Sequence, residues 1–447
     1  MRKKIVEGSV LFISILKWLF LATCIGVIVG ISTAAFLILL NISISNVTKH
    51  HYYFLLLPVA LFLSALVVKV FAPDAEGHGT EKIIEAVHRY SGKMNVMVVP
   101  VKLVATIITI AFGGSAGKEG PAAQIGAALA SAFSRLLRFG DRDRKKLVIC
   151  GISAGFAAVF GTPIAGALFG VEVLFVGSML YDVLLPSFVA GIVGYQVSSA
   201  LGITYFHEAV SLVPAFSSYF FLKICLAGLF FGICSLIMIE TLILFERLSH
   251  RAKVWKPAKG LIGGLALILL AWLSSTRYLG LGLDTIKSVL SGGEVPGGAF
   301  LLKILFTAIT LSFGGSGGIV TPIFFVGATA GNAFGSVLGF NTSLFSAIGM
   351  VALLAGAANT PISASIMAIE FFGPQIGPYA AVACIISFLM TGHRSVYPSQ
   401  VLSLAKSSSL TVAKGSEMRD VGAVEYRLRP KSVSNMLLKF ITWLRGQ

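Results

Sequence analysis

Three glycine-rich breaks interrupt the apolar segments of this chain, and one of them carries a carboxylic acid. Residues 113–121 read GGSAGKEGP and include Glu119, residues 314–322 read GGSGGIVTP, and residues 77–81 read GHGTE. The first two end in proline, which fits the first turn of a helix because its missing N–H is not needed there. We therefore expect each break to lead into the N-terminus of a helix buried in the apolar part of the molecule.

Anion binding is the chemistry that such helix ends can perform. A helix N-terminus offers unpaired N–H groups and about half a positive charge, so it attracts an anion without a cationic side chain. Several N-termini aimed at one place would hold a small anion weakly enough to release it, whereas a lysine or arginine there would bind it more tightly and slow its passage. The breaks therefore predict a pathway for a small anion.

Glycine also has a purely structural use, because glycine-rich stretches in membrane proteins usually allow helices to pack closely. That use suits Gly126 and Gly151, which lie inside apolar segments. On the same view Glu119 is a packed or capping side chain. An ionisable residue inside a membrane segment is functional by default, however, so we interpret Glu119 as a functional residue.

Composition indicates the class of protein. Of the 447 residues, 56% are hydrophobic and only 12% are charged. A soluble domain carries about a quarter charged residues, so a soluble enzyme and a disordered chain are excluded. The apolar segments are also too long for the strands of a membrane β-barrel, which have roughly ten residues of alternating polarity. We predict an all-α polytopic membrane protein and not an enzyme.

The charge distribution predicts the topology. Lys and Arg number 35 against 19 Asp and Glu, which gives a net charge of +16. The basic residues gather between or beyond the apolar segments, at 2–4, 135–146, 247–259 and 406–445. The positive-inside rule assigns such loops to the cytoplasm. We therefore expect both termini in the cytoplasm, a plasma or inner membrane location, and no binding of nucleic acid.

The two proline-containing breaks belong to an internal repeat. Residues 102–121 and 303–322 are identical at ten of twenty positions, and a second block, 161–173, matches 359–371. Interrupted helices in corresponding places of two halves are typical of transporters. We therefore predict membrane repeat one at 1–210, membrane repeat two at 211–400 and a basic cytoplasmic tail at 401–447.

Together these motifs resemble the CLC family of chloride channels and anion/proton exchangers. Residues 117–121 are similar to its G-[KR]-E-G-P motif, 318–322 resemble its G-x-F-x-P motif, and 77–81 lie where it has G-S-G-I-P. Residues 391–397 resemble the start of the family's last helix, with Tyr397 as the pore tyrosine. The likeness covers nearly the whole membrane part of the chain.

The resemblance implies a CLC-type fold of two inverted-topology repeats with broken helices, transport of chloride or another small monovalent anion, and a homodimer with one ion path per subunit. It makes Glu119 the gating glutamate, whose carboxylate can take the anion's place at a helix N-terminus and leave when protonated. The implied anion-binding residues are His78, Gly79, Gly117, Lys118, Gly120, Ile319, Val320, Thr321 and Tyr397.

Three positions depart from the family's pattern at the anion site. His78 replaces a serine, and either its neutral imidazole donates as the hydroxyl does or the side chain points away and the backbone alone binds the anion. Val320 replaces the pore phenylalanine and Thr321 its neighbour, which makes the outer gate smaller and more polar. Some fluoride-exporting members also differ at these positions, so the choice between chloride and fluoride stays open.

The proton route also differs from that of the family's exchangers. Many of them place a second glutamate directly after the position of Glu172, where this chain has Val173, which cannot carry a proton. This favours a channel-like, glutamate-gated chloride pathway, with a fluoride/proton or chloride/proton antiporter as the alternative. Glu172 matches Glu370 in the repeat, and we interpret both as structural groups that cap or bridge helices.

No cofactor and no metal site are predicted. The five cysteines lie in apolar stretches without a Cys-x-x-Cys pair, which is typical of buried thiols. His207 and Glu208 could contact a metal, but a lone pair rarely binds one. The apolar run 436–444, among basic residues, predicts an amphipathic tail segment on anionic lipid.

Overall fold

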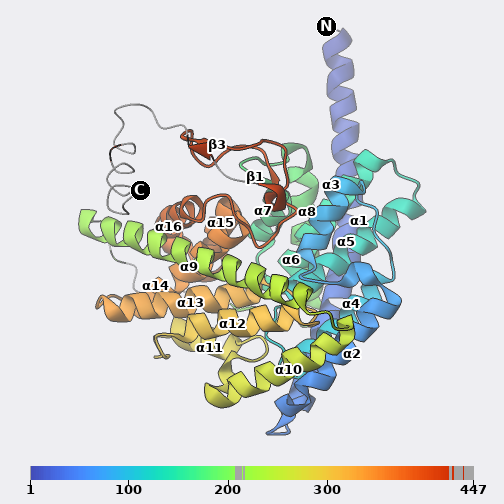
Figure 1. The fold of residues 1–447 in the computed structure, drawn as a ribbon. Helices are drawn as coiled ribbons and strands as arrows, with labels where there is room; N and C mark the ends of the chain where they lie inside the picture. The colour runs from blue at the N-terminus through green and yellow to red at the C-terminus, as the bar shows by residue number, and fades with distance from the viewer. Residues whose placement is uncertain (1, 207–213, 215–216, 422–424, 427–435, 437–447) are drawn as a thin grey trace.

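The computed structural model describes residues 2–206, 214, 217–421, 425–426 and 436. Helices dominate this part of the chain (Figure 1). The first eight α-helices are α1 (Arg2–Val47), α2 (Leu57–Phe71), α3 (Thr80–Arg89), α4 (Val98–Ala111), α5 (Glu119–Leu136), α6 (Asp141–Phe160), α7 (Pro163–Glu172) and α8 (Leu184–Ala200). The next eight are α9 (Ser218–Arg251), α10 (Lys256–Leu273), α11 (Leu283–Leu290), α12 (Ala299–Ser312), α13 (Val320–Val337), α14 (Thr342–Ala358), α15 (Pro361–Phe372) and α16 (Gly377–Met390).

Strands are few and short among the described residues. They are β1 (Phe175–Val176), which pairs in parallel with β2 (Val401–Leu402), and β3 (Leu410–Thr411), which pairs antiparallel with β4 (Glu425–Tyr426). Single-turn 3-10 helices lie between α-helices at Tyr53–Leu56, Pro73–Ala75, Tyr181–Val183, Thr276–Tyr278 and Pro374–Ile376, and one more, Met418–Asp420, lies between β3 and β4. The all-α prediction is confirmed.

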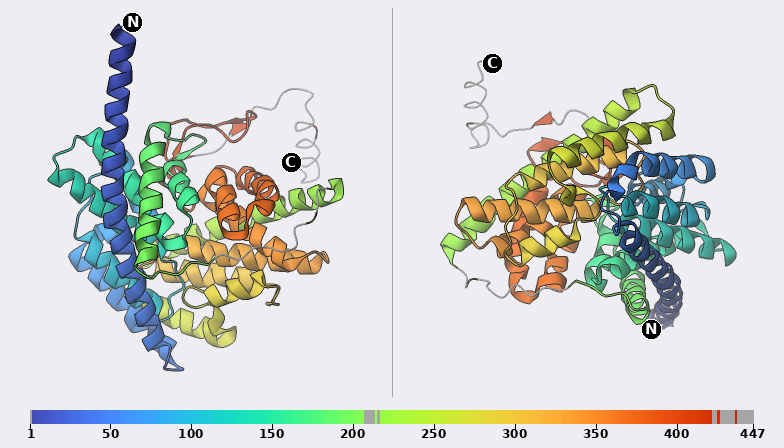
Figure 2. Two further views of the ribbon diagram at one scale, coloured as in Figure 1. Left: turned by 180° about the vertical axis from the view of Figure 1, so that it is seen from behind. Right: turned by 90° about the horizontal axis from the view of Figure 1, so that it is seen from below.

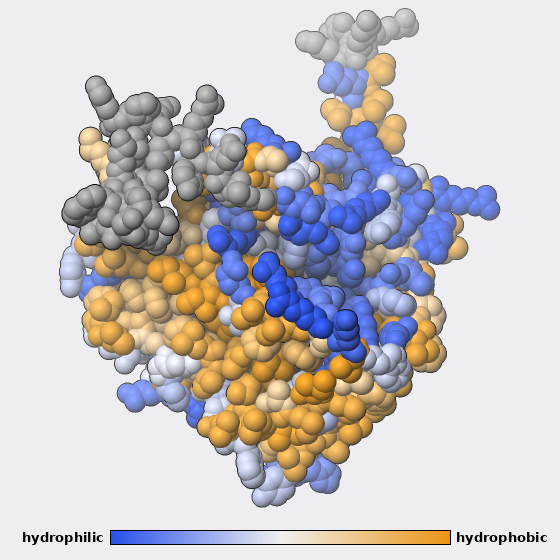
Figure 3. Space-filling view, viewed as in Figure 1, coloured by the Kyte–Doolittle hydropathy of each residue, from blue (hydrophilic) through white to orange (hydrophobic). Residues whose placement is uncertain are grey.

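The helices have the length and surface of a membrane protein. In the described part of the chain, six are long and apolar enough to cross a bilayer, and the others include shorter apolar helices of 10–17 residues. Hydrophobic residues cover the middle and lower part of the molecular face in Figure 3, while hydrophilic residues gather towards its upper part. An apolar outer surface of this kind is stable in lipid and not in water. The chain is an integral, multi-pass membrane protein.

The two halves of the chain repeat one order of helices. Helices α4 and α12 have 14 residues each, and the following pair, α5 and α13, have 18 each. Seen from below, the blue-to-green helices and the yellow-to-orange helices form two neighbouring groups (Figure 2). This arrangement agrees with two repeats of broken helices, each of which leaves its shorter helices inside the protein.

Two long apolar segments, 147–175 and 343–372, each contain two helices instead of one. The first segment breaks at Gly161, which has a left-handed φ of 72°, and α7 then begins at Pro163. The second breaks at Asn359, with a φ of 57°, and α15 begins at Pro361. A left-handed residue ends a helix and proline starts the next one, so both breaks follow from local sequence.

Close helix packing explains several glycines outside the breaks. A Cβ on Gly126 of α5 would lie 2.6 Å from the carbonyl oxygen of Gly151 in α6, so the two backbones are in direct contact. The corresponding pair in the second half, Gly327 and Gly349, is equally close. The structural interpretation of Gly126 and Gly151 is confirmed.

The prediction that a last helix starts within residues 391–397 is wrong. Helix α16 ends at Met390, and residues 391–400 form turns that lead into β2. Pro398 directly follows Tyr397, and a residue before proline is disfavoured in helical conformation. The chain then pairs with the end of α7, because Val401 N donates to the carbonyl of Leu174 at 3.3 Å. Residues 391–421 therefore lie on the membrane helices as a folded segment, which we call the cap.

The cap has a small apolar core of its own. It consists of the buried residues Val176, Leu402 and Met418, against which Phe388 and other apolar side chains pack. Lys406 fastens the cap to the helix ends, since its Nζ donates to Asn359 Oδ1 at 2.6 Å and to the carbonyl of Phe388 at 2.7 Å. Of the predicted amphipathic segment 436–444, only residue 436 is described; the rest lies outside the described residues, as do His207 and Glu208.

Candidate anion site

Three helix N-termini meet at one place inside the molecule, as the glycine-rich breaks predict. Helix α3 begins at Thr80, α5 at Glu119 and α13 at Val320. A Cβ on Gly79 would overlap with the carbonyl oxygen of Gly120, and a Cβ on Gly120 would lie 3.0 Å from the Cα of Gly318. Only glycines permit backbones to approach this closely.

The two proline-containing breaks face each other with two-fold regularity. Gly117 N donates to the carbonyl of Gly318 at 2.7 Å, and Gly318 N donates to the carbonyl of Gly117 at 2.6 Å. Around this bridge, hydroxyls from one repeat satisfy backbone donors of the other. Ser115 N donates to Thr310 Oγ1 at 3.0 Å, and in the corresponding bond Ser316 N donates to Thr109 Oγ1 at 3.0 Å. A second matching pair joins hydroxyls, Ser115 with Thr307 at 2.9 Å and Ser316 with Thr106 at 3.3 Å.

The Glu119 carboxylate occupies the N-terminus of α13. Its Oε1 accepts a hydrogen bond from Val320 N at 2.5 Å, and its Oε2 accepts one from Thr321 Oγ1 at 2.7 Å. The residue is fully buried. A Cβ on Gly117 or on Gly318 would overlap with the carboxylate, so the two glycines provide the space in which it lies.

Two predicted site residues have a buried polar atom without a hydrogen-bond partner among the described residues, namely His78 Nδ1 and the Tyr397 hydroxyl. The Tyr397 hydroxyl lies near the Thr80 side chain at the start of α3 and near Glu119. The buried ring of His78 lies near Lys102, in the turn directly before α3. Buried polar groups are normally hydrogen-bonded, so an unpaired hydroxyl near a carboxylate at a helix N-terminus indicates a place for a polar ligand.

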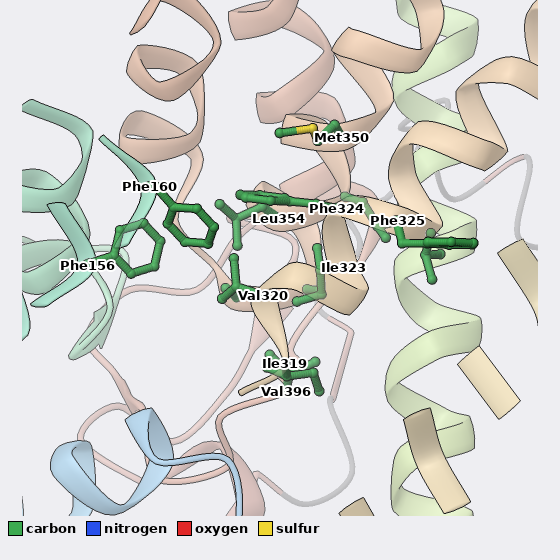
Figure 4. Packing of buried hydrophobic residues seen from close by; sticks show 14 of the residues in the cluster. Phe156, Phe160, Ile319, Val320, Ile323, Phe324, Phe325, Met350, Leu354 and Val396 are labelled. Atoms are coloured by element: carbon green, nitrogen blue, oxygen red, sulfur yellow. The ribbon is translucent and has the colours of Figure 1, made fainter. Parts of the chain in front are cut away.

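The apolar wall of the site comes from the first turns of α13. Ile319 and Val320 are buried and belong to one apolar cluster. The Val320 side chain lies with Phe160, Ile323 and Phe324, and Ile319 is drawn below them, towards Val396 (Figure 4). The rings of Phe160 and Phe324 are 5.1 Å apart. Val320 thus presents its N–H to the carboxylate and its side chain to the core.

The remaining predicted residues surround the site through their backbones. Lys118 is the residue before α5, and its carbonyl accepts a hydrogen bond from Ala122 N at 3.2 Å. Its side chain is partly exposed. Gly79, Gly117 and Gly120 form the backbone contacts described above. Every predicted residue except Val173 therefore lies in or beside one region.

Val173 lies away from the carboxylate, in the apolar core at the end of α7. Its side chain is fully buried, and its carbonyl accepts a hydrogen bond from Gln400 Nε2 at 2.8 Å. Glu172 accepts bonds from two backbone N–H groups of α15, Ile362 at 3.0 Å and Ser363 at 2.8 Å. The interpretation of Glu172 as a capping residue is confirmed.

Sequence reasoning missed two buried lysines that form hydrogen bonds to the loops before α3 and α11. Lys102 Nζ donates to the carbonyls of Ala75 at 2.9 Å and Gly77 at 2.6 Å, in the loop that carries His78. In the second half, Lys303 Nζ donates to the carbonyls of Tyr278 at 3.0 Å and Gly280 at 2.8 Å. Both lysines are fully buried. The sequence signal that could have indicated them is that Lys102 and Lys303 are aligned, identical positions of the internal repeat.

Metal chemistry has no candidate centre in the described part of the chain. No group of three or more His, Cys, Asp or Glu side chains there could hold a metal ion. All five cysteines lie in that part and are free thiols.

A family model for voltage-gated chloride channels matches residues 59–392, which include all three helix N-termini of the site. The chain belongs to the CLC family. Tyr397 lies beyond the matched residues, and its assignment to the site of this CLC protein rests on its position near Thr80 and Glu119.

Individual CLC relatives extend the comparison. The chain is 37% identical over 395 residues to a chloride/fluoride channel protein of Pseudomonas syringae pv. tomato, with 86% of each chain covered. It is 30% identical over 336 residues to the voltage-gated chloride channel ClcB of Salmonella typhimurium, which covers 72% of this chain and 79% of the relative.

Solved structures agree with the family. A CLC-type fluoride/proton antiporter superposes with a TM-score of 0.83 at 28% identity, over 87% of this chain and 98% of that one. A slow cyanobacterial chloride/proton antiporter, at 19% identity, shares the fold with a TM-score of 0.73 over 84% and 94%. This CLC protein therefore has the architecture of an anion transport protein.

Proposed function

We propose that this CLC protein conducts a small halide through a pathway that the Glu119 carboxylate opens and closes. The observation that carries the proposal is the position of that carboxylate, which accepts hydrogen bonds from Val320 N and Thr321 Oγ1. These are donors that an anion at the N-terminus of α13 would use. Carboxylate and halide compete for one site, so the pathway is closed while Glu119 is ionised and in place.

Protonation supplies the opening step. A neutral carboxyl group gains less from the positive end of a helix than a carboxylate does. It therefore leaves the N-terminus of α13, and a halide takes its hydrogen bonds. The Tyr397 hydroxyl and His78 Nδ1 have no partners among the described residues, and we propose that both side chains donate to the halide as it passes.

Chloride is the first candidate for the halide, because the family model and several relatives are named for it. Fluoride is the second candidate, and three features favour it. One relative is named for both ions, the fluoride/proton antiporter is structurally similar, and Thr321 adds a hydroxyl donor directly at the site. A site with more donors compensates better for the strong hydration that fluoride loses.

Passive conduction is the mechanism that we propose over proton exchange. Val173 occupies the position at which many exchangers have a second glutamate, and a buried valine cannot transfer a proton. A proton-coupled mechanism would need another route from the cytoplasm to Glu119.

A homodimer in the plasma or inner membrane, with both termini in the cytoplasm, completes the proposal. The start of α1 and the strand β3 lie at the same end of the molecule (Figure 1). Ile164 and Ile362, at matching positions in the first turns of α7 and α15, are 43% and 48% exposed and offer an apolar contact to a second copy. Light scattering of the purified protein tests this: a molar mass of one chain would contradict it.

Halide efflux from proteoliposomes tests the gating role. Wild-type protein, Glu119→Gln and the control Glu246→Gln would be compared in chloride and in fluoride, with external pH recorded. Glu246 is an exposed residue of α9 that lies 3.8 Å from His250. We expect Glu119→Gln to change the efflux rate and remove its pH dependence, and Glu246→Gln to behave as wild type. Equal, equally pH-dependent efflux in all three would contradict the proposal, and uphill proton movement would establish exchange instead of a channel.

A further inference from the structure

Glu81, beside the anion site, holds the turn that carries Tyr397. It is the second residue of α3, directly after Thr80. Its Oε1 accepts hydrogen bonds from Ser399 Oγ at 2.6 Å and from Ser399 N at 3.0 Å, and its Oε2 lies 3.2 Å from the same N–H. Ser399 lies two residues after Tyr397. One carboxylate therefore ties the start of α3 to the turn of the pore tyrosine.

The cap adds an arginine to this contact. Arg419 Nη2 donates to Glu81 Oε1 at 3.3 Å and to Ser399 Oγ. Its Nε lies 2.8 Å from Glu417 Oε2, and Glu417 Oε1 accepts a bond from Arg89 Nε at 2.6 Å. Arg89 is the last residue of α3. The cap thus contacts both ends of the helix whose first turn faces the site.

A second set of bonds fixes the Tyr397 turn from its other side. Gln400 Nε2 donates to the carbonyls of Val173 and Ala358, both at 2.8 Å. Its Oε1 accepts a bond from Ser395 Oγ at 2.6 Å, and Ser395 Oγ accepts one from Tyr397 N at 2.9 Å. The turn is held at both sides, so a change at Glu81 moves it relative to α3 and not relative to α7.

We propose that Glu81 and Arg419 are positioning residues of the anion pathway. Together they set the distance between the Tyr397 hydroxyl and the His78 turn, and with it the relative passage of halides of different size. Segment 399–421 thereby acts on the pathway through the contacts of Ser399 and Arg419 with Glu81. This inference rests on the proposed anion pathway and adds to it the residues that adjust selectivity from the cytoplasmic cap.

Glu81 has a rival role as a carrier of protons towards Tyr397 and Glu119. Its two oxygens already accept four hydrogen bonds, three from Ser399 and one from Arg419. These bonds occupy both oxygens and hold the carboxylate in one place, whereas a relay must be free to take up and release a proton, so we interpret Glu81 as an anchor. The test below separates the two roles.

Halide efflux from proteoliposomes is the test, with the ratio of chloride to fluoride rates as the readout. The variants are Glu81→Gln, Arg419→Gln and the double variant, with Glu246→Gln as the control. Glu246 is an exposed residue of α9 that lies 3.8 Å from His250, outside the cap contact. Each single variant should shift the ratio by roughly threefold or more. The double variant should shift it no further than the larger single one, because both act through one contact.

Several results would overturn the inference. Chloride and fluoride rates that fall together at a constant ratio indicate a structural role only, and independent, multiplying shifts in the double variant indicate no shared contact. Loss of proton movement at a constant ratio assigns Glu81 to proton transfer. If Glu81→Gln does not fold, Ser399→Ala removes one bond of the contact, and an unchanged ratio there overturns the inference as well. No efflux from wild-type protein overturns the proposed function itself, whereas wild-type efflux with unaffected variants overturns this inference alone.

Discussion

Glu172 and Glu370 cap each other's helices across the repeat. Glu172, the last residue of α7, accepts bonds from Ile362 N and Ser363 N at the start of α15. Glu370, near the end of α15, accepts bonds from Ile164 N at 2.9 Å and from Ala165 N at 2.8 Å at the start of α7. Each carboxylate therefore neutralises the positive end of the opposite helix, which contrasts with Glu119 at the start of α13.

Glu172→Gln should lower stability without altering selectivity. The neutral amide cannot compensate the positive helix end, and its NH2 group donates where a carboxylate oxygen accepts. We therefore expect the free energy of unfolding to fall by about 1–3 kcal/mol. The apparent unfolding temperature in detergent measures it, with Glu246→Gln as the exposed control. Glu370→Gln should give a loss of similar size. Unchanged stability with an altered chloride/fluoride ratio would contradict the capping role.

Gly318→Ala should block the site. The added Cβ would overlap with the space that the Glu119 carboxylate occupies, and that a halide would occupy after it leaves. We expect halide efflux to fall on the order of tenfold or more. Gly140→Ala is the matched control, because nothing lies within 4 Å of a Cβ at that position. Efflux of Gly318→Ala equal to that of Gly140→Ala would show that the halide takes another path.

His78→Ser should change selectivity more than rate. The buried Nδ1 of His78 has no partner among the described residues, and a serine hydroxyl at this position would reach less far into the site. We expect the ratio of chloride to fluoride efflux to shift by roughly fivefold. His250→Ser, at a side chain that is 76% exposed, serves as the control. An unchanged ratio would mean that the imidazole does not face the anion.

The two buried lysines should have equal effects on stability and unequal effects on transport. Lys102→Met and Lys303→Met each leave two buried carbonyls unpaired, which should lower the free energy of unfolding by about 1–3 kcal/mol. Only Lys102 bonds to the loop that carries His78. We therefore expect efflux per folded protein to fall in Lys102→Met and to persist in Lys303→Met. The same fall in both variants would contradict a specific role for Lys102.

The sequence was sufficient to predict where the site lies. Glycine-rich breaks that end in proline located the starts of α5 and α13, and the repeat paired Glu172 with Glu370 before their contacts were visible. These features are local, because glycine and proline restrict the backbone at their own positions. Helix type and the membrane class followed from composition in the same way.

The sequence was not sufficient where distant segments decide the structure. Tyr397 precedes a proline, a local signal against the predicted last helix, but its pairing with the end of α7 depends on Gln400 contacts to Val173 and Ala358. The partners of Lys102 lie more than twenty residues away, at Ala75 and Gly77. Such contacts depend on the tertiary fold, and residue spacing alone does not predict them.

Competition between the Glu119 carboxylate and a halide for one site is the central claim, and calorimetric titration tests it most directly. Chloride and fluoride would be titrated into purified wild-type protein and Glu119→Gln at acidic and at alkaline pH. Competition predicts that wild-type protein binds halide more tightly as the pH falls, and that Glu119→Gln binds at least as tightly at both pH values. Equal affinity of wild-type protein at both pH values, matched by Glu119→Gln, would show that the carboxylate and the anion do not share a site.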